Sequence, residues 1–255
     1  MRAIILAAGR GLRLQQSEDR QEPKCLMRFD GMSLLERHLR MLSNAGVVEV
    51  VLALGFRHEM VSAELDRLAW QPRPQIVLNE RFELGSVLTV HTVAEAMTRG
   101  GDVLLMDADV LYDERIMKAL VDGKQHVNRL LIDRDFEAGD EPVKICLRGG
   151  VPVELRKQLA PDLVFDAIGE SVGFFRFDEA GARRLAALVA GYVEGGQGHM
   201  PHEEAVRDLL RERTQAVEVA DVTGTPWIEI DFTGDVARAA RDVLPQLEPL
   251  VGANK

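Results

Sequence analysis

Apolar runs and amphipathic segments alternate through the first half of the chain. Residues 3–8 form a continuous apolar run that ends at Gly9, a pattern typical of a strand buried on both faces. In residues 33–44 the apolar positions recur at helical spacing, with Ser33 as the expected N-cap and Glu36 three residues later. The alternation continues with strands predicted over 47–54, 75–78 and 103–106 and helices over 58–68 and 86–97. This order predicts βαβ units and a parallel sheet covered by helices.

The second half of the chain has a different pattern, in which short predicted strands follow one another more closely. Helices are expected over 179–192, 202–213 and 236–244, and a mobile glycine-containing loop over 191–202. No internal repeat or Ser/Pro linker divides the sequence, so we predict one α/β domain over residues 1–255, with halves 1–125 and 126–255. The strands expected here are 128–132, 143–147, 151–155, 171–177, 216–222 and 227–230.

Composition narrows the function classes. The 255 residues include 31 Lys and Arg against 41 Asp and Glu, a net charge of −10, which disfavours binding to nucleic acids or anionic membranes. The only cysteines, Cys25 and Cys146, suggest neither a disulfide framework nor a zinc site. We find no signal peptide and no apolar run long enough for a membrane span, so a cytoplasmic location is expected.

A turn rich in small residues follows the first predicted strand. Its backbone N–H groups could approach a phosphate closely, while Arg13 and Lys24 could neutralise the charge. The dinucleotide fingerprint is incomplete because Leu14 stands where its third glycine belongs, and no P-loop is present. An ordinary strand-to-helix turn remains an alternative. The candidate nucleotide-binding residues are Leu6, Ala7, Ala8, Gly9, Arg10 and Gly11.

Carboxylates are placed at two positions where they could share a cation. Asp107 and Asp109 directly follow the strand predicted over 103–106, and Mg²⁺ prefers few carboxylates together with substrate phosphates. Glu229 and Asp231 would lie on one face of a late strand, since side chains alternate along a strand. Asp also favours turns, which is the simpler reading of the first pair. We expect Asp235 to cap the helix that follows.

Two segments carry a family resemblance. The sequence L-A-A-G-R-G-L-R-L, followed by P-K-C-L, resembles the signature of the sugar-phosphate nucleotidyltransferase superfamily. The resemblance implies a Rossmann-like (GT-A-like) three-layer sandwich with a mostly parallel mixed sheet. It also implies that the glycine turn wraps a nucleoside triphosphate, that Arg13 and Lys24 contact its phosphates as catalytic residues, and that Mg²⁺ is bound. The implied ligands are Asp107 and Asp231, with Asp109 and Glu229 beside them.

Further candidates lie on the substrate side. Asn79 and Ser86 are expected near the nucleoside, although Ser86 could simply cap a helix. The candidate acceptor-binding residues are Lys144, Lys157, Glu170 and Glu203. For the last of these, the alternative is that an acidic residue at the start of a helix favours the helix dipole. A quaternary ammonium would need an aromatic cage, for which the candidates are Trp227, Tyr192, Tyr112 and Phe174.

The implied reaction is attack by a phosphate or phosphonate oxygen on the α-phosphorus of a nucleoside triphosphate, with release of pyrophosphate. D-A-D-V and W-I-E-I-D resemble the small phosphocholine and phosphonate cytidylyltransferases, so CTP and a small anionic acceptor, including polyol phosphates, are favoured. In this reading, residues 1–125 bind the nucleotide and 126–255 bind the acceptor and supply the late metal ligand. A sugar-1-phosphate nucleotidyltransferase, a GT-A glycosyltransferase and a non-catalytic nucleotide-binding module remain alternatives, and a homodimer is left open.

Overall fold

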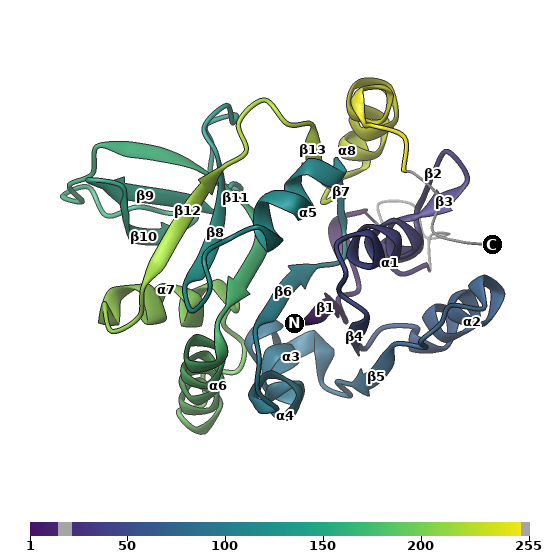
Figure 1. Cartoon of the computed structure of the whole chain (residues 1–255), viewed down its shortest axis with the longest axis horizontal. Helices are drawn as coiled ribbons and strands as arrows, with labels where there is room; N and C mark the ends of the chain where they lie inside the picture. The colour runs from purple at the N-terminus through teal and green to yellow at the C-terminus, as the bar shows by residue number, and fades with distance from the viewer. Residues whose placement is uncertain (15–21, 251–255) are drawn as a thin grey trace.

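A computed structural model describes residues 1–14 and 22–250 of the chain, built around one nine-stranded mixed sheet (Figure 1). In its first half, β1 (Arg2–Ala7) lies between β4 (Glu49–Leu54) and β6 (Val103–Asp107) and is parallel to both. The edge strand β5 (Gln75–Leu78) is parallel to β4. Because these strands run in one direction, their carboxyl ends share one edge of the sheet, where Leu6 pairs with Asp107.

The second half of the sheet is mainly antiparallel and continues from the long strand β11. This strand pairs antiparallel with β6, β8 and β9, and so joins the two halves of the chain in one sheet. Two small sheets lie apart from it, and one of them pairs the segment after β6 with the late strand β13. The strands of this half of the main sheet are β8 (Asn128–Asp133), β9 (Lys144–Arg148), β10 (Val151–Arg156), β11 (Ala167–Phe177) and β12 (Val217–Asp221). In the two small sheets, β2 (Arg28–Phe29) pairs with β3 (Met32–Ser33), and β7 (Val110–Tyr112) pairs with β13 (Trp227–Glu229).

Helices cover both faces of the sheet and bury two apolar clusters. Successive residues of β1 point to opposite faces, so that Ile5 belongs to one cluster and Ile4 to the other. The first cluster is closed by α1 (Leu34–Asn44), α2 (His58–Leu68) and α5 (Glu114–Val121). The second is closed by α3 (Ser86–Thr92), α4 (Ala94–Thr98), α6 (Glu179–Glu194) and α7 (Glu203–Glu212). The three-layer α/β fold expected from the sequence is confirmed.

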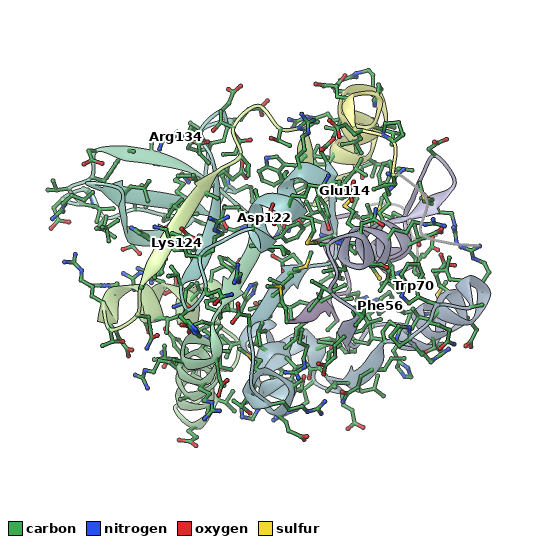
Figure 2. The ribbon with its side chains drawn as sticks, in the orientation of Figure 1. Phe56, Trp70, Glu114, Asp122, Lys124 and Arg134 are labelled. Atoms are coloured by element: carbon green, nitrogen blue, oxygen red, sulfur yellow. The ribbon has the colours of Figure 1, made fainter. Side chains whose placement is uncertain are left out.

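Several local features differ from the sequence prediction. The helix α5, between the labelled Glu114 and Asp122 in Figure 2, was not predicted, nor were β2, β3 and β7. The predicted helix 86–97 is divided at Val93, and α8 (Thr233–Arg238) begins three residues before the predicted start. The segment expected to be a mobile loop packs against α3, where Met200 O accepts a hydrogen bond from Val87 N at 3.1 Å. In the part of the chain described, no helix has the length and apolar character needed to cross a membrane.

Candidate active site

Three carboxylates meet at the carboxyl edge of the sheet. Asp109, Glu229 and Asp231 each offer an oxygen, and these three oxygens lie within 4.8 Å of one another. Ile230 N donates to Asp109 O at 2.9 Å and joins the two segments that carry them. Asp235, expected to cap a helix starting after it, instead lies inside α8 and accepts from Asp231 N at 3.0 Å. Backbone contacts therefore fix the positions of all three carboxylates.

Lys24 lies between two of these carboxylates. Its Nζ is 2.9 Å from Asp109 Oδ2 and 2.7 Å from Asp231 Oδ1. Burial alone would lower the pKa of Lys24, but the charges of Asp109 and Asp231 outweigh it and raise the pKa above its ordinary value. Gly11 makes room for this side chain, because a Cβ there would lie 3.0 Å from Lys24 Cε and the backbone has a φ of +65°. Lys24 is therefore a fixed, charged ammonium group.

Arg13 reaches the same carboxylate cluster from the glycine turn. Its Nη1 lies 3.2 Å from Asp231 Oδ2 and 2.8 Å from Glu141 Oε2. Lys157 Nζ contacts the same Glu141 oxygen at 3.1 Å. Burial would raise the pKa of Asp231, but Lys24 and Arg13 hold it below its ordinary value. Sequence analysis missed Glu141, which lies in a loop without a recognisable motif.

Asp107 lies next to this cluster but is not one of its three members. Burial, and then the neighbouring charges of Asp109 and Glu203, raise its pKa well above the ordinary value. Gly173, with a φ of +78°, allows this packing, because a Cβ at that position would lie 2.5 Å from Asp107 Oδ2. Glu229 also has a raised pKa, first from burial and then from the nearby acidic groups. The site thus holds more negative charge than Lys24 and Arg13 balance.

This donor set fits a divalent cation. Mg²⁺ binds oxygen ligands, usually one or two carboxylates together with phosphates and water. Among the described residues, Glu229 has no hydrogen-bond or ion-pair partner, and a cation would compensate its charge. Asp109, Glu229 and Asp231 are therefore the residues best placed to hold a metal, with Asp107 adjacent to them.

A buried histidine supports the turn between Asp107 and Asp109. His38 Nε2 is 3.3 Å from Ala108 O, and its Nδ1 is 3.2 Å from the Tyr112 hydroxyl. Burial lowers the pKa of His38 to about 4, so the ring is neutral near pH 7. Since a carbonyl oxygen only accepts, Nε2 carries the proton and Nδ1 accepts from Tyr112. His38 was not predicted to have a role, because it lies 70 positions from Ala108.

The glycine turn forms one side of an open cavity of about 510 Å³. Ala8 O accepts from Phe56 N at 3.0 Å, and Gly55 must lack a side chain because a Cβ would lie 2.8 Å from Ala8 O. The predicted residues Leu6, Ala7 and Gly9 lie on β1 and the turn that follows it. The cavity is lined by Arg10, Gly11, Leu12, Arg13, Lys24, Phe82, Glu83 and Asp231.

The predicted nucleoside residues Asn79 and Ser86 follow β5. Asn79 is buried, and its amide donates to Thr89 Oγ1 at 3.0 Å and accepts from Arg81 N at 3.0 Å. Ser86 is the first residue of α3, and its hydroxyl accepts from His202 N at 2.8 Å. In this structure both side chains have partners within the protein.

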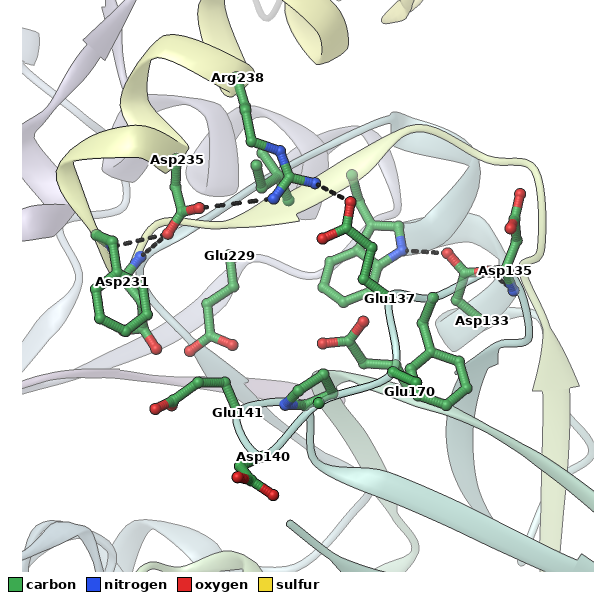
Figure 3. A pocket seen from close by; sticks show the side chains of 17 residues that line it. Asp133, Asp135, Glu137, Asp140, Glu141, Glu170, Glu229, Asp231, Asp235 and Arg238 are labelled. Carbon is green, nitrogen blue, oxygen red and sulfur yellow. Dashed lines mark hydrogen bonds and ion pairs between the residues drawn. The ribbon is translucent and has the colours of Figure 1, made fainter.

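A second cavity, of about 600 Å³, is also lined by Asp231 (Figure 3). Glu170, a predicted acceptor residue, points into it. Lys144 donates to three backbone carbonyls, those of Gly139 and Lys157 at 2.6 Å and Pro142 at 3.3 Å. Lys157 and Glu203 line a separate cavity of about 570 Å³. Three of the four predicted acceptor residues therefore line these two cavities, whereas Lys144 lines neither.

Comparisons with known proteins identify the family and the relatives of the chain. The family model for the MobA-like NTP transferase domain matches residues 3–164. The chain is 20% identical over 261 residues to the CTP:phosphoglutamine cytidylyltransferase of Campylobacter jejuni, covering 92% of this chain and 98% of that protein. It is 26% identical to the CMP-5'-(3-aminopropyl)phosphonate synthase of Streptomyces rubellomurinus, covering 94% of this chain but only 38% of that protein.

A solved structure shares the fold. The inositol-1-phosphate CTP transferase from T. maritima superposes with a TM-score of 0.76 at 19% identity, covering 99% of this chain and 98% of that one. Because the family model spans more than half of the sequence, the chain belongs to the MobA-like NTP transferase domain family. It is a nucleotidyltransferase, and its relatives include cytidylyltransferases.

Proposed function

We propose that this protein is a Mg²⁺-dependent cytidylyltransferase that transfers CMP from CTP to a small acceptor bearing a phosphate or phosphonate group. The observation that carries the proposal is the place of Asp231, which lines both the cavity beside the glycine turn and the second cavity. A nucleotide in the first and an acceptor in the second would meet at the carboxylates and Lys24. Two cavities that share one lining side chain would bring their substrates close together, which a transfer between them requires.

In this proposal the glycine turn and its two cations hold the phosphates of the nucleotide. Gly11 permits close approach of the backbone, Arg13 offers a planar set of donors, and Lys24 supplies a point charge. An acceptor oxygen attacks the α-phosphorus, and the bond to the bridging oxygen of the β-phosphate breaks. Pyrophosphate leaves with that electron pair. The acceptor oxygen is already ionised, so the step needs no general base.

Asp109, Glu229 and Asp231 would hold Mg²⁺, which when bound supplies charge neutralisation for the triphosphate. His38 holds the backbone between Asp107 and Asp109 from below, and Asp235 holds the backbone of Asp231. These contacts of His38 and Asp235 with the backbone would keep the carboxylates in a defined arrangement, as metal sites generally need.

CTP is the favoured nucleotide because the relatives named above use CTP or make a CMP conjugate, according to their names. Those names also describe acceptors that differ widely, from a phosphorylated amino acid to an aminoalkylphosphonate and a polyol phosphate. The acceptor class must therefore come from the residues of this chain.

A matrix of four nucleoside triphosphates against several acceptors, assayed by pyrophosphate release, tests the proposal. Suitable acceptors are phosphoethanolamine, phosphocholine, 2-aminoethylphosphonate, inositol-1-phosphate and glucose-1-phosphate. The proposal predicts Mg²⁺-dependent, acceptor-dependent release that is fastest with CTP. Release with glucose-1-phosphate alone would instead indicate a nucleotidyltransferase that makes NDP-sugars. Binding of nucleotide without any release across the matrix would contradict an enzymatic function.

A further inference from the structure

The second cavity lined by Asp231 has mostly acidic side chains in its lining. Nine carboxylates and one arginine line its volume of about 600 Å³, together with three aromatic side chains. A phosphate alone would be repelled by such a lining, so the cavity has to accommodate a different part of the acceptor. The charged residues are Asp133, Asp135, Glu137, Asp140, Glu141, Glu170, Glu229, Asp231, Asp235 and Arg238, and the aromatic residues are Phe136, Trp227 and Phe232.

Protein cations partner only some of these carboxylates. Arg238 lies 3.6 Å from Glu137 and 3.9 Å from Asp235, and Lys24 and Arg13 face Asp231. Glu141 contacts Arg13 and Lys157. Figure 3 draws no interaction to Glu229 or to Glu170, both of which line the cavity. The unbalanced charge therefore faces the interior of the cavity.

Glu170 is the informative member of this pair because it lies outside the three-carboxylate metal cluster. Among the described residues its carboxylate has neither a hydrogen bond nor an ion pair. Lys144 is opposite Glu170 in the pairing of β9 with β11, but its ammonium is occupied by three backbone carbonyls. A metal bound at the cluster would thus leave Glu170 uncompensated. Burial and the charge of Asp133 raise the pKa of Glu170 to about 7.

The aromatic residues give the cavity a second property suited to an organic cation. Trp227 Nε1 donates to Asp133 Oδ2 at 2.8 Å, which fixes the indole ring in the wall. Aromatic faces attract ammonium groups and also pack against short methylene chains. Of the four aromatic residues considered from the sequence, Tyr112 and Phe174 are instead fully buried in the core. The cavity therefore combines carboxylates with one fixed indole and two phenyl side chains, rather than a cage of four rings.

We propose that this cavity is an ammonium subsite, so that the acceptor carries a positively charged amine at the end opposite its phosphate or phosphonate. Glu170 would accept hydrogen bonds from the ammonium group, and Trp227 would pack against the chain between the two charged ends. A neutral polyol could donate hydrogen bonds to these carboxylates but would leave their charge unbalanced. The inference rests on the proposed function for the identity of the other end of the acceptor, and it narrows the acceptor class.

A matched pair of acceptors tests the subsite. Phosphoethanolamine and ethyl phosphate share a phosphate ester and a two-carbon chain, and differ in the ammonium group. With CTP and Mg²⁺, we expect kcat/KM for phosphoethanolamine to exceed that for ethyl phosphate by about ten-fold or more, the effect of one charge-assisted hydrogen bond. Equal values, or a preference for ethyl phosphate, would overturn the proposal. This comparison uses the wild-type protein and does not depend on any variant folding.

The variant Glu170→Gln keeps the size of the side chain and removes its charge. We expect it to reduce the ratio of kcat/KM for phosphoethanolamine to kcat/KM for ethyl phosphate about ten-fold, mainly through a higher KM for phosphoethanolamine. The control is Glu95→Gln, which makes the same change at an exposed surface position that pairs with Arg99. An equal loss of kcat/KM with both acceptors in Glu170→Gln would show that Glu170 supports the fold and does not bind the ammonium group.

Binding measurements separate this proposal from the proposed function. Calorimetric titration of the two compounds into the Mg²⁺-loaded protein reports the subsite even when no turnover occurs. If no nucleotide and acceptor give pyrophosphate, but phosphoethanolamine binds about ten-fold more tightly than ethyl phosphate and loses that advantage in Glu170→Gln, the subsite stands and the cytidylyltransferase assignment fails. Equal affinities for the two compounds would overturn the subsite whatever the activity.

Discussion

Lys24 Nζ lies 2.7 Å from Asp231 Oδ1, although 207 positions separate the two residues in the chain. Lys24 follows the glycine turn after β1, whereas Asp231 follows β13 near the end of the described chain. Their contact lies at the meeting point of two cavities, because Asp231 lines both. One ion pair thus joins the nucleotide side and the acceptor side of the proposed site.

Lys24→Ala should lower kcat/KM for pyrophosphate release by about 100-fold or more, since a group that neutralises transition-state charge is lost. The same change leaves Asp109 and Asp231 without their shared cation. Steady-state kinetics with circular dichroism as the folding check makes the measurement. Lys118→Ala, an exposed lysine 3.9 Å from Glu114, is the control and should retain wild-type activity. A folded Lys24→Ala protein with normal turnover would remove Lys24 from the mechanism.

Metal removal should abolish turnover. Excess EDTA is expected to stop pyrophosphate release, and added MgCl₂ to restore it. Asp109→Asn should raise the Mg²⁺ concentration for half-maximal activity about ten-fold or more, because Asp109 contributes one of the three clustered carboxylates. Asp66→Asn, at an exposed carboxylate that pairs with Arg73, is the control and should leave the Mg²⁺ requirement unchanged. Full activity in EDTA would show that the carboxylates serve another purpose.

His38→Leu should impair both stability and turnover through Ala108. Without the imidazole, the carbonyl of Ala108 loses its buried donor, which costs about 1–3 kcal/mol of unfolding free energy. The turn carrying Asp107 and Asp109 then loses its support, so we also expect a higher Mg²⁺ requirement. His38→Gln, whose amide can still donate, should recover part of both effects. Urea denaturation and Mg²⁺ titration of the two variants make the test; an unchanged Mg²⁺ requirement in His38→Leu would limit His38 to a packing role.

Glu170 should make stability depend on pH. Burial, and then the charges of Asp133 and Glu137, raise its pKa to about 7 in the folded protein from an ordinary value of 4.5, while Lys144 and Arg238 oppose the shift. Between pH 4.5 and pH 7, Glu170 is therefore protonated in the folded protein but ionised in the unfolded chain. The resulting stabilisation is complete below pH 4.5 and disappears as the pH rises through 7.

Glu170→Gln cannot titrate, so it should be more stable than wild type at pH 8, by up to about 3 kcal/mol. The difference should shrink towards zero as the pH falls to 4.5. Urea denaturation of both proteins at several pH values measures it, and the other titrating groups cancel in the comparison. A difference that stays constant from pH 5 to pH 8 would contradict the raised pKa.

Much of the fold follows from local sequence, because buried strands are apolar runs and helices carry spaced apolar residues. The β1 run, the Ser33 cap and the position of Asp107 at a strand end were all predicted in this way; Ser33 Oγ indeed accepts from Glu36 N at 3.1 Å. The parts that sequence reasoning missed depend on contacts between distant segments. The pairing of β7 with β13 is an example, since neither partner has a strong pattern of its own.

The candidate site was predicted as a set of residue types, but not as an arrangement. The motifs identified Asp109, Glu229 and Asp231, and the structure brings these three together. Asp107, ranked first as a ligand from the resemblance, lies outside that trio, because Gly173 lets it pack against β11. Glu141 is not part of a recognisable motif, and it joins the candidate site only through its contact with Arg13 in the folded chain. The polar segment that separates the glycine turn from Lys24 includes residues 15–21, which lie outside the described chain.

In the proposed reaction, the protein joins a nucleoside monophosphate to an acceptor at the carboxylates around Lys24. Phosphorus NMR of a mixture with CTP, MgCl₂ and phosphoethanolamine would detect both products. We expect a new pair of coupled diphosphate resonances from the CMP conjugate, formed in equal amount with pyrophosphate and absent in Lys24→Ala. Loss of CTP to CDP and inorganic phosphate, or no loss of any nucleoside triphosphate across the acceptor series, would contradict this proposal.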